Sequence, residues 1–180
     1  ESAISSFNTA KDSLRAARTI TIPKRSDQLW LVTDGSIKSS GICATLYVTR
    51  PHTKNPLLAG FFGAKLKQHQ PRWLSCELEA LAITAACNHF KPFIIQLSKQ
   101  SIVLTDSKPC VEAYKKLSRG EFSASARVQT FLTIVNQLNL SIRHVSGSSN
   151  IVADHASRNA RPCNASNCQI CKLNYEVEES

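Results

Sequence analysis

The segment QLWLVTDGS, residues 28–36, decides the fold class of this chain. Residues 28–34 alternate in polarity and are rich in strand-forming residues, so they predict a central strand that ends at Asp34. Two further strands are predicted at residues 41–49 and 57–64, and the turn-rich sequence RPHTKNP joins them. The first three strands are therefore expected to form an antiparallel meander.

Helices and strands alternate over the rest of the chain. Pro92 is expected to end the long helix before it, and Ser107 is a plausible N-cap. The predicted helices span residues 4–18, 74–90, 107–117, 126–137 and 151–157, and the remaining predicted strands span 101–105 and 140–145. Three consecutive strands followed by strands separated by helices predict an α/β fold, with a five-stranded mixed sheet (three antiparallel strands, then parallel strands) flanked by helices.

Four carboxylates stand at positions where this topology brings them together. Asp34 and Asp106 each end a strand, and neighbouring strand ends of an open α/β sheet form a crevice. A glutamate on the helix between them and Asp154 at the start of the last helix are expected to close a ring. Crowded carboxylates repel one another, so the ring predicts divalent cations; oxygen ligands favour magnesium or manganese over zinc. Taken singly, each acid is equally well explained as a helix cap or turn residue.

Two glutamates compete for the helical position in this ring. Glu77 and Glu79 are two residues apart, about 200° around a helix, so only one of them points at the centre. The stripe of Glu79 (Ala82, Ile83, Ala86 and Phe90) is wholly apolar, whereas that of Glu77 includes Thr84 and Asn88. We therefore predict Glu79 at the buried ligand position and Glu77 on a solvated flank.

These motifs resemble those of a known family. An F-x-x-x-K helix and a Pro-containing link lead into a TD[AG]S strand, an E-L-L-A-I helix ends in H-F, and TD-x-K-P-L and G-x-x-N-x-x-A-D-x-x-S-R motifs follow. The matching residues here are Phe7, Lys11, Pro23, 33–36, 79–83, His89, Phe90, 105–110 and 147–158. From Phe7 to Arg158 the chain thus resembles the end of a reverse transcriptase followed by the ribonuclease H domain of gypsy-type LTR retrotransposons.

The resemblance implies a fold, an activity and a division of the chain. It implies the end of a reverse transcriptase or connection segment at residues 1–27, a ribonuclease H domain at 28–159 and a Cys-containing tail at 160–180. The implied reaction is endonucleolytic hydrolysis of the RNA strand of RNA:DNA hybrids during reverse transcription, by a two-metal mechanism with Mg²⁺, for which Mn²⁺ can substitute. The implied catalytic residues and metal ligands are Asp34, Glu79, Asp106 and Asp154. The loop at residues 147–150 lacks the histidine that cellular ribonucleases H carry there.

A formal charge of +9 favours an anionic partner. For an RNA:DNA hybrid, 2′-hydroxyls on one strand and phosphates on both are the features to be recognised. The candidate substrate-binding residues are Gly35, Ser36, Ser39, Lys65, Lys67, Arg72, Ser75, Lys115, Lys116, Arg119 and Ser123. Trp73 is expected to staple its helix to the sheet rather than to stack on a nucleotide, and Trp30 is expected in the core.

The C-terminal tail raises a separate question. Cys163, Cys168 and Cys171 form a C-x4-C-x2-C pattern, and His155 is the nearest histidine, so these four residues are a candidate zinc site. A linker with reduced thiols is the alternative. The other four cysteines lie singly in apolar settings, which predicts buried thiols and an intracellular location. The resemblance to retrotransposons implies that this location is a cytoplasmic retroelement particle or the nucleus.

The sequence limits the other classes of function. It contains no run of 18 uncharged apolar residues, so no membrane association is expected. The absence of methionine, even at position 1, suggests a segment of a longer polyprotein, whose polymerase portion is an expected partner. The sequence does not predict an oligomeric state. Two alternatives remain: a non-catalytic ribonuclease H-like module that binds nucleic acid, and an integrase or transposase-like core for DNA strand transfer. Retention of all four acids disfavours the first, and the A-D-x-x-S-R ending disfavours the second.

Overall fold

The computed structural model describes residues 4–9, 12, 20–38, 40–52, 55–67, 72–121, 125–150, 152–153 and 158. Its strands are β1 (Gln28–Ser36), β2 (Gly41–Thr49), β3 (Leu57–Lys65), β4 (Ser101–Thr105) and β5 (Leu140–His144). Its helices are α2 (Ser75–His89), α3 (Lys91–Gln96), α4 (Lys108–Ser118) and α5 (Ala126–Asn136), followed by the 3-10 turn η2 (Gly147–Ser149).

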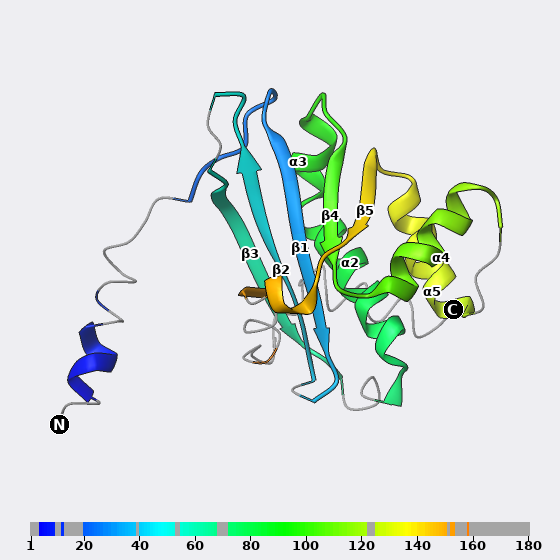
Figure 1. Ribbon diagram of the computed structural model, residues 1–180, viewed down its shortest axis with the longest axis horizontal. Coiled ribbons are helices and arrows are strands. Elements are labelled where there is room, and N and C mark those ends of the chain that lie inside the picture. The colour runs from blue at the N-terminus through cyan, green and yellow to red at the C-terminus, as the bar shows by residue number, and fades with distance from the viewer. Residues whose placement is uncertain are drawn as a thin grey trace.

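The five strands form one mixed sheet in the order β3-β2-β1-β4-β5 (Figure 1). Strand β1 is antiparallel to β2, and β2 is antiparallel to β3. Strand β4 is parallel to both β1 and β5. The predicted fold class is therefore confirmed, with β1 at the centre of the sheet and the ends of β1 and β4 next to each other.

The main hydrophobic core lies between the sheet and α2, α4 and α5. Leu29 and Leu31 of β1 are fully buried, as is Phe131 of α5. Helix α2 contacts β1 and β2 on one side and α4 and α5 on another, and every residue from 77 to 87 is buried. A helix packed on several sides carries no solvated flank, so the predicted exposed position of Glu77 is wrong.

Most element boundaries agree with the prediction within two residues, but α3 was not predicted. Pro92 lies in the first turn of α3, where a missing amide hydrogen costs nothing. The proline was expected only to end the preceding helix, whereas it also begins the next one. The predicted helix over 4–18 is described at 4–9 and 12, where the chain is helical; of the predicted 151–157 helix, 152 and 153 are described, and both are helical.

The two tryptophans have different surroundings. Trp73 packs against the core, with its ring 6.0 Å from that of Phe131, as expected for a residue that staples a helix. Trp30 is only half-buried and lines an apolar cavity of about 540 Å³, so its predicted core position is wrong. Its indole Nε1 donates a 3.0 Å hydrogen bond to Thr49 Oγ1 of β2. Within the described part of the chain, no helix has both the length and the apolar character needed to span a bilayer.

Candidate active site

Three carboxylates meet where β1 and β4 end. Asp34 is near the end of β1, Asp106 directly follows β4, and Glu79 lies in the second turn of α2. One carboxylate oxygen from each lies within 4.8 Å of those of the other two. Asp34 and Glu79 are buried and Asp106 is partly exposed, so the cluster can be reached from solvent through Asp106. Of the two competing glutamates, Glu79 is the one that lies with the aspartates.

A glycine allows α2 to approach β1 this closely. A Cβ atom on Gly35 would lie 2.9 Å from the carbonyl oxygen of Leu78 and 3.2 Å from the amide nitrogen of Glu79. Any larger residue would therefore push the backbone of α2 away from β1. The Gly35 backbone also forms a hydrogen bond with the Glu79 carboxylate, so the TDGS motif positions two of the three acids.

Electrostatics make the cluster unfavourable without a cation. Burial, and then the charges of Asp34 and Asp106, raise the pKa of Glu79 from 4.5 to about 9, although hydrogen bonds from Gly35 and Thr105 lower it. The Oε2 atom of Glu79 is buried and receives no hydrogen bond from any described residue. A buried acceptor without a donor, surrounded by other carboxylates, fits a hard divalent cation that binds oxygen ligands.

The segment after β5 runs across this cluster. The Val145 amide donates to the carbonyl of Thr105, at the end of β4. A Cβ on Gly147 would lie 3.3 Å from Asp106 Oδ2, so the turn η2 packs against that carboxylate. The side chain of Asn150 donates to the Thr33 carbonyl at 3.1 Å and lies 3.5 Å from Asp34 Oδ1.

The next contact of this segment lies one residue before Asp154. The Cys43 thiol donates a 2.6 Å hydrogen bond to the carbonyl of Ala153, which is fully buried. Cys43 is the antiparallel partner of Asp34 in the β1–β2 register. The chain is thus held beside Asp34 immediately before position 154. Asp154 itself lies outside the described residues, as do His155, Cys163, Cys168 and Cys171 of the candidate zinc site.

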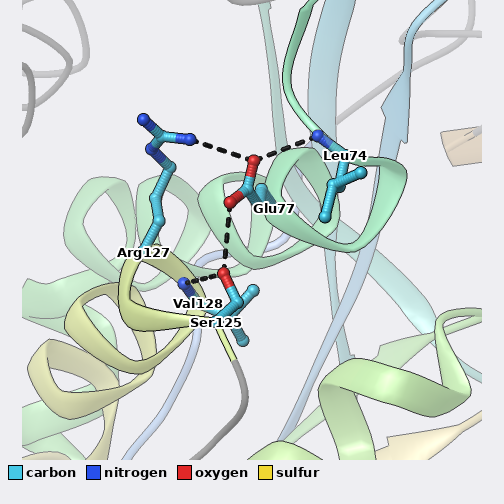
Figure 2. A network of polar contacts seen from close by, with 5 residues as sticks. All are labelled: Leu74, Glu77, Ser125, Arg127 and Val128. Carbon is cyan, nitrogen blue, oxygen red and sulfur yellow. Dashed lines mark hydrogen bonds and ion pairs between the residues drawn. The ribbon is translucent and has the colours of Figure 1, made fainter.

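Glu77, which is buried, forms a polar network with partly exposed partners that the sequence did not predict (Figure 2). Its Oε2 accepts hydrogen bonds from the Leu74 amide and from Arg127 Nη1, each at 3.0 Å, and its Oε1 accepts one from Ser125 Oγ at 3.1 Å. Arg127 also lies 4.3 Å from the centroid of the Trp73 ring. The network joins the first turn of α2 to the first turn of α5. The contact from the Leu74 amide to Glu77 caps the start of α2, and an acid at the third position of a helix is the sequence signal that could have predicted it.

The predicted substrate-binding residues lie around the cluster at differing exposures. Gly35 and Ser36 follow Asp34 in β1, and Ser75 is exposed at the start of α2. In α4 and after it, Lys115 pairs with Glu112 at 2.8 Å and Arg119 pairs with Glu121 at 3.1 Å. The side chains of Lys65, Arg72 and Lys116 are exposed, that of Lys67 is half-buried, and Ser39 and Ser123 lie outside the described residues. Their contacts with a substrate stay predictions.

The described cysteines fit the expectation of reduced thiols. Cys43, Cys76, Cys87 and Cys110 form no disulfide. Three of them are buried, and Cys76 is half-buried. Burial raises the pKa of Cys87 and Cys110 to about 12, so both thiols are protonated at neutral pH. These two cysteines therefore serve as small apolar core residues.

Solved structures with the same fold come from cellular and viral enzymes. RNase H1 of the halophilic archaeon Halobacterium salinarum NRC-1 aligns with a TM-score of 0.55 and 15% identity over 74% of this chain and 96% of its own. LC11-RNase H1 from compost, in complex with an RNA/DNA hybrid, aligns at 0.53 and 16%, over 74% and 96%. The foamy viral protease-reverse transcriptase in complex with dsDNA aligns at 0.52 and 13%, over 77% of this chain and 28% of its own.

At these identities the structural similarity shows the fold alone. No curated protein sequence matches the chain. A family model does: that of the RNase H-like domain found in reverse transcriptase matches residues 1–104, more than half of the chain and a range that includes Asp34 and Glu79. The chain therefore belongs to the family of RNase H-like domains found in reverse transcriptases.

Proposed function

We propose that this domain is a metal-dependent ribonuclease H that hydrolyses the RNA strand of RNA:DNA hybrids. The observation that carries the proposal is the cluster of Asp34, Glu79 and Asp106, whose oxygens lie within 4.8 Å of one another. Burying carboxylates side by side destabilises a fold unless something offsets their charge. A domain that only bound nucleic acid would gain nothing from retaining them.

The oxygen donors and the shape of the cluster fit magnesium, with manganese as a substitute. Two such ions would supply an activated water and neutralise the charge that develops on the leaving oxygen of the phosphodiester. Asp34 and Glu79 would hold the ions from the buried side. Asp106, which is partly exposed, would face the scissile phosphate.

Asp154 is the proposed fourth ligand. Ala153, the residue before it, accepts a hydrogen bond from Cys43, and Cys43 pairs directly with Asp34 across the β1–β2 ladder. Asp154 follows Ala153 directly in the chain, and consecutive Cα atoms are about 3.8 Å apart. The described neighbours therefore favour a position for Asp154 close to the cluster.

Recognition of the hybrid would rest on duplex shape and on the backbone. The hydroxyls of Ser36 and Ser75 lie on the two elements that carry Asp34 and Glu79, where they can meet 2′-hydroxyls of the strand being cut. Lys65 and Arg72, before α2, and Lys116, late in α4, can meet phosphates on either side. Ser39, Lys67, Lys115, Arg119 and Ser123 are proposed for the same surface.

We infer a wider context from the motifs. The pattern from Phe7 to Arg158 supports a gypsy-type retroelement as the source and the polymerase portion of the parent polyprotein as a partner. Residues 1–27 would be the end of the polymerase or connection segment, 28–159 the nuclease and 160–180 the tail. Activity would then occur inside the cell, in a cytoplasmic particle or in the nucleus.

The test compares three labelled substrates of equal length: an RNA:DNA hybrid, an RNA duplex and a DNA duplex, each with and without Mg²⁺. We expect cleavage of only the RNA strand of the hybrid, and only with Mg²⁺. The variant Asp106→Asn is expected to lose this cleavage and to retain most hybrid binding, because it replaces one carboxylate oxygen without changing the size of the side chain.

The other outcomes separate the alternatives. Binding of the hybrid without cleavage by the unaltered protein would indicate a non-catalytic module, and joining or nicking of DNA strands would indicate a strand-transfer core. Normal turnover by Asp106→Asn would refute the assigned site. Asp12→Asn makes the same Asp-to-Asn change at an exposed position outside the proposed site, so it is the matched control and is expected to cleave normally.

A further inference from the structure

Strands β1 and β4 separate just before the acidic cluster, and Asn150 lies at the point of separation. Their parallel pairing ends at Val32 and Leu104. Beyond it the Thr33 carbonyl accepts a 3.1 Å hydrogen bond from the Asn150 side-chain amide instead. The Thr33 hydroxyl meanwhile donates to the Leu104 carbonyl at 3.3 Å. The Asn150 side chain thus supplies the hydrogen-bond donor that β4 no longer offers to the Thr33 carbonyl.

The same amide nitrogen reaches the cluster. Asn150 Nδ2 is 3.5 Å from Asp34 Oδ1, and an amide has two hydrogens, so one group can serve the Thr33 carbonyl and the Asp34 carboxylate together. A neutral donor beside Asp34 fixes the rotation of its carboxylate. It also partly offsets the negative charge without occupying the space of a cation.

Asn150 is not explained by packing. Its side chain is 1% exposed, and its Oδ1 atom is buried with no hydrogen-bond donor among the described residues. An unpartnered buried carbonyl is unfavourable, and an apolar residue of similar size would avoid it. The hydrogen bonds from Asn150 Nδ2 to the Thr33 carbonyl and to Asp34 Oδ1 offset this cost.

We propose that Asn150 is a positioning residue of the metal centre: its amide orients Asp34 and anchors to β1 the segment that leads to Asp154. This inference rests on the proposed function. Gly147 holds the same segment near the cluster, because its lack of a side chain lets the turn η2, just before Asn150, lie against Asp106. Partners that orient metal ligands typically change metal affinity about 10–100-fold when they are removed.

The test measures metal binding by the full chain in the absence of substrate. The dissociation constant for Mn²⁺ is determined by titration calorimetry for the unaltered protein and for Asn150→Ala, below the melting temperature of each metal-free protein. We expect Asn150→Ala to bind Mn²⁺ at least about tenfold more weakly. The hybrid-cleavage rate at limiting Mn²⁺ should fall in parallel and recover at saturating Mn²⁺.

Two controls separate positioning from general loss of structure. Thr45→Val removes a different buried polar group from β2 of the same sheet, a hydroxyl with no hydrogen-bond partner among the described residues. Ile142→Ala removes buried apolar volume from β5. Both are expected to keep the Mn²⁺ affinity of the unaltered protein, and Ile142→Ala is expected to lower the melting temperature.

The outcomes distinguish this inference from the proposed function. If Asn150→Ala keeps the same Mn²⁺ affinity as the two controls, Asn150 is structural and the inference is overturned, while the nuclease proposal stands. If the unaltered protein itself binds no Mn²⁺, the proposed metal centre fails first. Weaker binding by Asn150→Ala alone supports the positioning role.

Discussion

Raising the pH is expected to destabilise the metal-free protein through one side chain, Glu79. Its pKa rises from 4.5 to about 9 on folding, chiefly through burial and then through the charges of Asp34 and Asp106. The folded protein therefore keeps a proton that the unfolded chain releases above pH 4.5. The stabilisation from this proton is complete below the unfolded pKa and is lost as the pH rises towards the folded pKa.

The size of the effect follows from proton linkage. Between the two pKa values, Glu79 lowers the free energy of unfolding by about 1.4 kcal/mol for each pH unit. From about pH 5 to about pH 7 the loss is about 3 kcal/mol, which corresponds to a melting temperature lower by roughly 6–12 °C for a chain of this size. A bound divalent cation takes the place of the proton, so saturating Mg²⁺ should remove the decrease.

The assay is thermal unfolding at several pH values, in chelator and in excess Mg²⁺, for the unaltered protein and for Glu79→Gln. Glu79→Gln lacks the titrating group, so its melting temperature in chelator should change less with pH. Glu112→Gln, an exposed carboxylate of α4, is the control and should retain the full decrease. Identical pH profiles for the unaltered protein and Glu79→Gln would refute the reasoning.

Three further predictions concern other features of the chain. Gly35→Ala should lower the free energy of unfolding by about 1–3 kcal/mol and weaken Mn²⁺ binding, because its Cβ meets the α2 backbone; unchanged chemical denaturation and calorimetry would contradict this. Glu77→Ala should lower the free energy of unfolding measured in urea by about 2 kcal/mol, a value discounted because Arg127 is partly exposed. It should leave the Mn²⁺ affinity unchanged, and an altered affinity would place Glu77 in the metal centre. Purified protein should carry about one zinc per chain if the tail binds it, and Cys168→Ser should lose it; metal-free native protein would end that hypothesis.

The sequence alone predicted the fold class and, among the described residues, the three acids that lie together: Asp34, Glu79 and Asp106. Asp154, the fourth acid, stays a prediction. Alternating strand patterns, the TDGS and TD-x-K-P-L motifs and helix signals such as Ser107 are local features, and they act over a few residues. The N-cap hydrogen bond from the Cys110 amide to Ser107 Oγ is one local contact that was anticipated correctly. Because short-range backbone preferences and polarity patterns determine the order of strands and helices, this order can be read without coordinates.

Tertiary structure decided the surroundings of those residues. Glu77 was expected in solvent, but packing of α2 between the sheet and α5 buries it in a network with Ser125 and Arg127, about 50 residues away in sequence. The contact between Asn150 and Asp34 spans 116 positions, and no periodic pattern encodes it. The raised pKa of Glu79 likewise requires burial and two other carboxylates. Residue patterns determine which groups a chain offers, whereas the distances that set their protonation and metal affinity arise only when distant segments pack together.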